Sequence, residues 1–299
     1  LFTQPQQNIF AITILAAIIL SLVGMAGMQV LIYRIIGSGG DSAGGAASRS
    51  VKIGIAYSLI LSVILAAVVS PYFFKVLHFS TTDFIYFAAL LFLYSSTWAL
   101  VAAFWASEKY GHTAAIFIFS YLVIFALTYS AYAINPVYAI SGYTCGTAVL
   151  FLVFLLTSMI VFRRPKSPSG DNYSLTELVS QSSAAIMFNI FYILAIFLDK
   201  IIVWVYQGIN AGQGLLIAGP YTQGAFLGLI PMLSIATVAY FARRTKSLVD
   251  DRYNGTYSEI QKRIATYKRI YSNSATAMAF ITLVITAIVA SLTFFLIND

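Results

Sequence analysis

Long apolar runs are the dominant feature of this sequence. A helix needs about 20 apolar residues to cross a bilayer core about 30 Å thick, whereas the strands of membrane barrels run to about ten residues of alternating polarity. The runs found here are longer than such strands and are apolar on every side. We therefore predict an all-α fold, a polytopic transmembrane helical bundle with eight spans. The eight runs cover residues 8–33, 53–74, 84–106, 113–134, 137–162, 177–206, 215–242 and 271–297.

The composition agrees with this prediction. Of the 299 residues, 60% are hydrophobic and 9% are charged, whereas soluble domains carry about 25% charged residues. The exterior of a soluble fold needs more polar groups than this chain can supply. The composition excludes a soluble globular enzyme and a disordered chain, and the single cysteine, Cys145, excludes an internal disulfide.

Basic residues alternate between the connections. Fifteen of the 17 Lys and Arg lie in the connections after the first, third, fifth and seventh runs, whereas the opposite connections hold only Lys75. Loops rich in Lys and Arg remain in the cytoplasm. We therefore expect a protein of the cytoplasmic (inner) membrane, with its basic loops in the cytoplasm and Leu1 and Asp299 on the outer side. The same asymmetry accounts for the net charge of +7 without a nucleic acid partner.

The longest polar break in the middle of the chain marks a boundary. It covers residues 163–176 and reads RRPKSPSGDNYSLT, a composition typical of a linker. We expect a first transmembrane lobe of five spans at residues 1–163, a cytoplasmic linker at 164–176, and the start of a second lobe with three spans at 177–299. The chain begins at Leu1 rather than Met and stops directly after the eighth run, so we expect a fragment of a longer protein.

Two other connections have a distinct composition. Residues 37–48 are rich in Gly and Ser, and we expect them to be flexible. Residues 258–271 place apolar side chains at helical spacing and Lys and Arg on the other side, which predicts an amphipathic helix in the headgroup layer. This helix is interpreted either as an interfacial flank of the eighth span or as a docking surface for a cytoplasmic partner.

The sequence contains no catalytic or cofactor motif. The glycines at 37–40 lack the spacing of a phosphate-binding loop. His78 and His112 fall near opposite membrane faces, where they cannot share a metal ion. We therefore expect no enzyme activity, no cofactor and no metal site.

Asp199 and Lys200, in the sixth run, are an acid–base pair inside a span. An acidic residue at the centre of a membrane helix costs about 2.5–3.5 kcal/mol, so such residues usually face protein or water. Two interpretations remain open. Asp199 falls toward the outer end of the span, so the pair can be interfacial, with Lys200 reaching past Trp204 to the headgroups. Alternatively, the pair is functional.

Further polar residues favour a functional interpretation. Gln181, Ser182, Asn189, Tyr192 and Asp199 fall near one face of the sixth run. The seventh run adds Gln223, together with Pro231, which is expected to kink its helix. A polar stripe beside a kinked helix is typical of the cavity of a transporter. Hydroxyl residues in other runs, such as Ser95, Ser96 and Thr97, are interpreted equally as contacts between helices or as cavity lining.

Three segments of the chain carry a family resemblance. They are Phe191-Tyr192 with Leu198-Asp199-Lys200-Ile201-Ile202-Val203-Trp204, then Ile230-Pro231, and then the basic stretch with Tyr253 and Tyr257. Together they resemble the Pel exopolysaccharide exporters of the PelG type, within the MATE-like (multidrug/oligosaccharidyl-lipid/polysaccharide) flippase superfamily. The resemblance is best over residues 188–270.

The resemblance implies an architecture and a function. The superfamily has two six-helix lobes around a central cavity, so one helix would precede Leu1 and three would follow Asp299 in a twelve-helix transporter. The implied function is the export or flipping of a polysaccharide or lipid-linked sugar across the cytoplasmic membrane. The implied partners are a cytoplasmic glycosyltransferase and other membrane subunits of a synthase complex.

The candidate substrate or coupling residues and the rival functions complete the prediction. Asp199 is hypothesised to pair with a cationic aminosugar or to titrate as a coupling site. The alternatives are a drug/cation antiporter of the same architecture and a non-catalytic membrane anchor of a polysaccharide synthase complex. The full set of candidate residues is Asp199, Lys200, Asn189, Tyr192, Gln181, Gln223 and Pro231.

Overall fold

The computed structural model describes most of the chain up to residue 217 and four residues beyond it. The described ranges are 4–37, 43–75, 78–162, 175–207, 209–210 and 216–217, with the single residues 269, 272, 276 and 280. Apart from residues 216–217 and those isolated residues, the seventh and eighth predicted spans and the predicted helix at 258–271 therefore lie outside the described ranges. The linker up to residue 174 lies outside them too.

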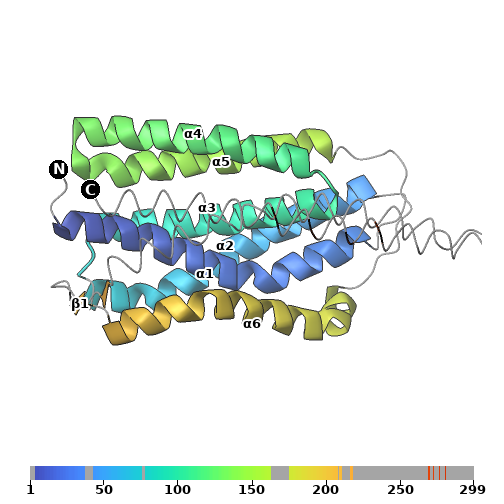
Figure 1. The fold of residues 1–299 in the computed structure, drawn as a ribbon. Coiled ribbons are helices and arrows are strands. Elements are labelled where there is room, and N and C mark those ends of the chain that lie inside the picture. Colours follow the sequence, from blue (N-terminus) through green and yellow to red (C-terminus); the bar gives the residue numbers. More distant parts are fainter. Residues whose placement is uncertain are drawn as a thin grey trace, which may run out of the picture. The chain divides into compact units, whose positions relative to one another are not determined.

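Helices account for nearly all of the described residues (Figure 1). Residues 136–138 form a 3₁₀ turn, η2 (Pro136–Tyr138), and two short strands, β1 (Ile209–Asn210) and β2 (Leu216–Ile217), pair with each other. The six α-helices are α1 (Gln4–Gly37), α2 (Ala43–Lys75), α3 (Thr81–Ala106), α4 (Tyr110–Ile134), α5 (Ala139–Val161) and α6 (Leu175–Gln207).

The predicted all-α membrane fold is confirmed. All six helices are long and apolar enough to cross a membrane, and they coincide with the first six predicted spans. The count of eight spans stays a prediction. The expectation that residues 37–48 are flexible is wrong for residues 43–48, because α2 already begins at Ala43. Ala47 of this segment is buried in the apolar core, and such packing supplies most of the stability of a helix in a protein.

The chain divides into two compact units, residues 1–216 and 217–299. Within the first unit α3 is the central helix. Helices α1, α2 and α5 pack against it, α4 packs mainly against α5, and α6 packs against α1 (Figure 1). The membrane-spanning stretch of α3 is 72% buried, against 17% for that of α4.

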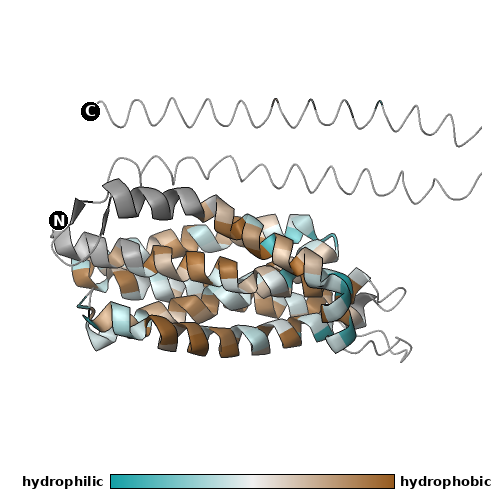
Figure 2. Ribbon diagram, turned by 90° about the horizontal axis from the view of Figure 1, so that it is seen from below, coloured by the Kyte–Doolittle hydropathy of each residue, from teal (hydrophilic) through white to brown (hydrophobic). Residues whose placement is uncertain are grey.

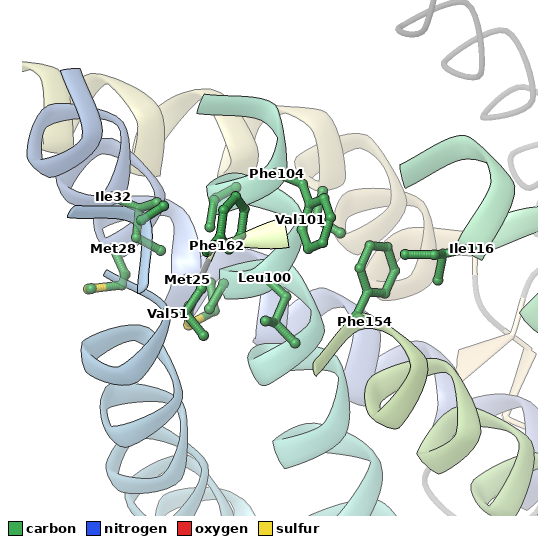
Figure 3. Packing of buried hydrophobic residues seen from close by; sticks show 14 of the residues in the cluster. Met25, Met28, Ile32, Val51, Leu100, Val101, Phe104, Ile116, Phe154 and Phe162 are labelled. Carbon is green, nitrogen blue, oxygen red and sulfur yellow. The ribbon is translucent and has the colours of Figure 1, made fainter. Parts of the chain in front are cut away.

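Two apolar clusters hold this unit together. The first, here called the Phe104 cluster, joins α1 to α5 around Phe104 and Phe154, whose rings meet edge to face (Figure 3). The second, the Phe87 cluster, lies toward the other end of α3 and contains Phe73, Phe79 and Phe87. Lipid tails are as apolar as these side chains, so close packing rather than the hydrophobic effect stabilises such contacts in a bilayer.

Glycines let α4 and α5 approach closely. A Cβ atom at Gly142 would lie 2.4 Å from the carbonyl oxygen of Leu127, and one at Gly146 would lie 2.6 Å from Cα of Ile124. Small residues at such contacts are typical of membrane helix pairs. The Asn135 side chain accepts a hydrogen bond from the Val137 backbone N–H at 3.0 Å and closes the tight turn between the two helices.

The charged residues gather at the ends of the helices. Arg34, Arg49, Lys52 and Lys109 are exposed and lie where α1 and α3 end and where α2 and α4 begin, at one end of the unit. Lys75 lies at the opposite end. Figure 2 shows the same distribution, with hydrophilic residues densest at one end of the helices. The predicted alternation of basic connections therefore holds for the first four helices.

Candidate functional site

Five of the predicted site residues lie on α6. The backbone of Asp199 and Lys200 is helical, near the end of α6, and their side chains lie outside what the structure describes. Gln223 and Pro231 also lie outside the described residues. The side chains of Gln181, Asn189 and Tyr192 are described.

Asn189 joins α6 to α1. Its Nδ2 donates a hydrogen bond to the carbonyl oxygen of Ala26 at 2.7 Å. The adjacent Gly27 allows this approach, since a Cβ there would lie 3.1 Å from Cγ2 of Ile186. Ser182 lies on the same covered face of α6 and is buried. An amide that reaches a backbone carbonyl of the next helix stabilises helix packing.

Gln181 and Tyr192 lie beside this contact and are exposed. The Gln181 amide is 3.4 Å from a carboxylate oxygen of Glu177, one turn earlier. Tyr192 stacks on Phe188, with ring centroids 6.3 Å apart and an interplanar angle of 12°. The stripe seen in the sequence thus has two parts. One edge packs on α1, and the other edge is open within the first unit.

The middle of α3 holds four consecutive polar side chains, Ser95, Ser96, Thr97 and Trp98, here called the α3 belt. The three hydroxyl residues are at most 2% exposed. Among the residues that the structure describes, the three hydroxyls and the indole Nε1 of Trp98 have no hydrogen-bond partner. A buried hydroxyl left in this state costs about 1–3 kcal/mol.

Most other hydroxyls in these helices behave differently. Ser58 donates to the carbonyl oxygen of Gly54 at 2.7 Å, and Thr147 donates to that of Tyr143 at 2.9 Å. This bond to the preceding turn is the usual solution for Ser and Thr inside helices. The same kind of bond is made by Ser21, Ser50, Ser70, Thr128, Ser141, Thr144, Thr157 and Ser158.

The belt lies between the two apolar clusters. The side chain of Trp98 packs against both of them. On the preceding turn Tyr94 and Tyr143 share a hydrogen bond between their hydroxyls, which joins α3 to α5. Hydroxyl groups of α3 and α5 therefore meet beside the belt, near the middle of the unit.

Part of this arrangement is predictable from the sequence. Ser95, Ser96 and Thr97 are candidate helix contacts or cavity lining there. Tyrosines usually lie at the membrane interface, so Tyr94, close to the centre of its run, is a second signal that the sequence carries. Only the packed structure shows that these groups meet and that the belt is left without partners.

The structure gives no basis for a metal centre in the part that it describes. No group of three or more His, Cys, Asp or Glu side chains comes together there. His78 lies in the turn between α2 and α3, and His112 lies in the first turn of α4, at opposite ends of the unit as expected.

These observations define a class of protein. Six apolar helices long enough to span a membrane, charged groups gathered toward the helix ends and buried hydroxyls in the middle are the properties of a multi-pass helical membrane protein. The chain belongs to the PelG family, whose model, described as "Putative exopolysaccharide Exporter (EPS-E)", matches residues 1–297. The PelG resemblance found in the sequence is thereby confirmed. Comparisons with curated proteins and with solved structures gave no match.

Proposed function

We propose that this chain moves an exopolysaccharide, or a lipid-linked sugar, across the cytoplasmic membrane as part of a two-lobe transporter of the MATE-like type. The observation that carries the proposal is the match to an exopolysaccharide exporter family over residues 1–297. The six apolar helices supply the membrane-embedded architecture that export requires.

The proposed path runs along the open edge of α6. Gln181 and Tyr192 are exposed there, so both are available to a ligand. Asp199 follows Tyr192 by seven residues and falls on nearly the same helical face. Amide, phenol and carboxylate groups suit the hydroxyls of a sugar, and an aromatic ring suits the apolar face of a pyranose. Lys200 extends the proposed lining, and Gln223 and Pro231 stay candidate residues predicted from the sequence.

The organisation around this path is part of the proposal. Residues 1–163 form the first lobe, 164–176 a cytoplasmic linker, and 177–299 the start of the second lobe. The basic connections face the cytoplasm, where a glycosyltransferase would deliver the growing polymer, and other membrane subunits complete the synthase complex. The family is one of exporters rather than enzymes, so the proposed role is transport without catalysis.

Export assays of α6 variants test the proposal. In cells that make the polymer, Tyr192→Ala and Asp199→Asn are expected to lower polymer export at equal protein level. Phe191→Ala is the matched control, because Phe191 is exposed on a neighbouring face of the same helix turn. Equal export by all three variants would contradict the α6 path.

Further outcomes separate the rival functions. Drug resistance without polymer export would indicate a drug/cation antiporter. Pull-down of a glycosyltransferase together with no transport by the purified complete protein would indicate a non-catalytic membrane anchor.

A further inference from the structure

The α3 belt is the least satisfied polar region that the structure describes. Ser95, Ser96 and Thr97 occupy successive helical positions, about 100° apart around the helix axis. Their hydroxyls therefore face different neighbours, and Trp98 adds an N–H donor in the remaining direction. A single partner from one neighbouring helix cannot satisfy all four groups.

Neither lipid nor the surrounding side chains supply these partners. The three hydroxyl residues are at most 2% exposed, so lipid does not reach them. On the adjacent helices the hydroxyls of Ser58 and Thr147 donate to carbonyls of their own helices, and neither accepts a hydrogen bond from the belt. Gly54 of α2 lies against Ala99 of α3. Because α2 and α3 run in opposite directions, Ser58, one turn after Gly54, lies level with Ser95, one turn before Ala99.

Four other hydroxyls among the described residues share the same condition, those of Ser62, Ser107, Ser120 and Ser182. Ser62 and Ser120 are buried on α2 and α4, two helices that pack on α3. The belt differs from these isolated groups because its four unpaired polar groups are consecutive, between the Phe104 and Phe87 clusters.

We propose that the α3 belt is a water-binding site inside the first unit. A water molecule both donates and accepts, and buried waters typically make about three hydrogen bonds to polar groups that lack other partners. The two apolar clusters confine the water to one layer. This site does not depend on which molecule the protein transports.

X-ray radiolysis footprinting of the complete protein in lipid nanodiscs tests the site. Radicals form from water that is held against a side chain, and they oxidise it even out of reach of bulk solvent. Relative to the intrinsic reactivity of each side chain, Tyr94 and Trp98 are expected to be oxidised several-fold faster than Met28. Met28 is buried in the Phe104 cluster and is the control for a dry interior. Equal relative rates for Tyr94, Trp98 and Met28 would overturn the proposal.

A pair of matched variants identifies the groups that hold the water. Replacing the belt by Ser95→Ala, Ser96→Ala and Thr97→Val is expected to bring the oxidation of Tyr94 down to the relative rate of Met28. The control carries Ser50→Ala and Ser158→Ala, which remove buried hydroxyls already bonded to their own helices, away from the belt. It is expected to keep the wild-type rate at Tyr94. If Tyr94 is still oxidised fast in a belt variant that folds, the proposed water site is wrong. If the belt variant does not fold, the comparison within the wild-type protein decides alone.

Discussion

At the scale of single residues, two turns depend on unusual backbone angles. Among the described residues other than glycine, His78 and Glu108 have positive φ, at 52° and 58°. Glu108 links α3 to α4, where the N–H groups of Ser107, Glu108 and Lys109 bond back to carbonyls of the last turn of α3. This arrangement closes the helix end, and it requires a left-handed residue where glycine is usual.

Among variants without the Glu108 carboxylate, glycine is therefore expected to be more stable than alanine. Glu108→Gly removes the cost of a side chain in the left-handed region, about 1 kcal/mol. Thermal unfolding in detergent measures the effect. Glu108→Ala is the control, since it removes the same carboxylate but keeps the Cβ. If the Gly and Ala variants unfold at the same temperature, the turn is not strained.

At the scale of elements, the helices differ in how they meet. α4 and α5 meet through glycines that bring backbone against backbone, whereas α6 meets α1 through Asn189 and the small Gly27. The first contact leaves no room for an added methyl group. The second includes a polar bond that a substitution can remove without steric conflict.

Gly142→Ala is expected to destabilise the α4–α5 pair. The new Cβ would meet the Leu127 carbonyl oxygen at 2.4 Å, and such overpacking costs about 1–3 kcal/mol. Gly111→Ala is the matched control, because nothing lies within 4 Å of a Cβ there and alanine favours a helix over glycine. Thermal unfolding is expected to shift down for the first variant and slightly up for the second.

Asn189→Leu tests the polar bond between α6 and α1. Hydrogen bonds between membrane helices contribute about 0.6 kcal/mol on average and about 1.7 at most, so a small destabilisation is expected. Gln181→Leu, on the open edge of the same helix, is expected to have no effect on unfolding. A larger loss for Gln181→Leu would mean that α6 packs through its other edge.

At the scale of the whole molecule, the charges at the helix ends predict an orientation. Lys109 and Lys75 are both exposed and lie at opposite ends of the first unit. Loops rich in Lys and Arg remain in the cytoplasm, and Lys109 shares its end with Arg34, Arg49 and Lys52.

Labelling of single-cysteine variants tests this orientation directly. In a Cys145→Ser background, which removes the exposed native thiol, a membrane-impermeant maleimide is expected to label Lys75→Cys in intact cells. Lys109→Cys is expected to react only after the membrane is opened. The reverse labelling pattern would show the opposite orientation, with the basic connections outside the cell.

Much of the fold was predictable from the sequence because the relevant signals are local. The length and apolarity of each run determine that it forms a spanning helix, and the bounds of α3 to α5 fall within a few residues of the runs at 84–106, 113–134 and 137–162. The alternation of Lys and Arg along the chain likewise needs no knowledge of packing. These signals alone predict six of the spans. They also predict that Arg34, Arg49, Lys52 and Lys109 lie at the same end of the first unit.

Only the tertiary structure decided which helix is central and which polar groups are satisfied. α3 is slightly less hydrophobic than α4, yet its spanning stretch is 72% buried against 17% for α4. The hydropathy of a helix depends only on its own residues, whereas its burial depends on the neighbouring helices that pack around it. For the same reason the α6 stripe looked uniform in the sequence, although Asn189 bonds to α1 and Tyr192 remains exposed. Contacts between residues far apart in the chain made that difference.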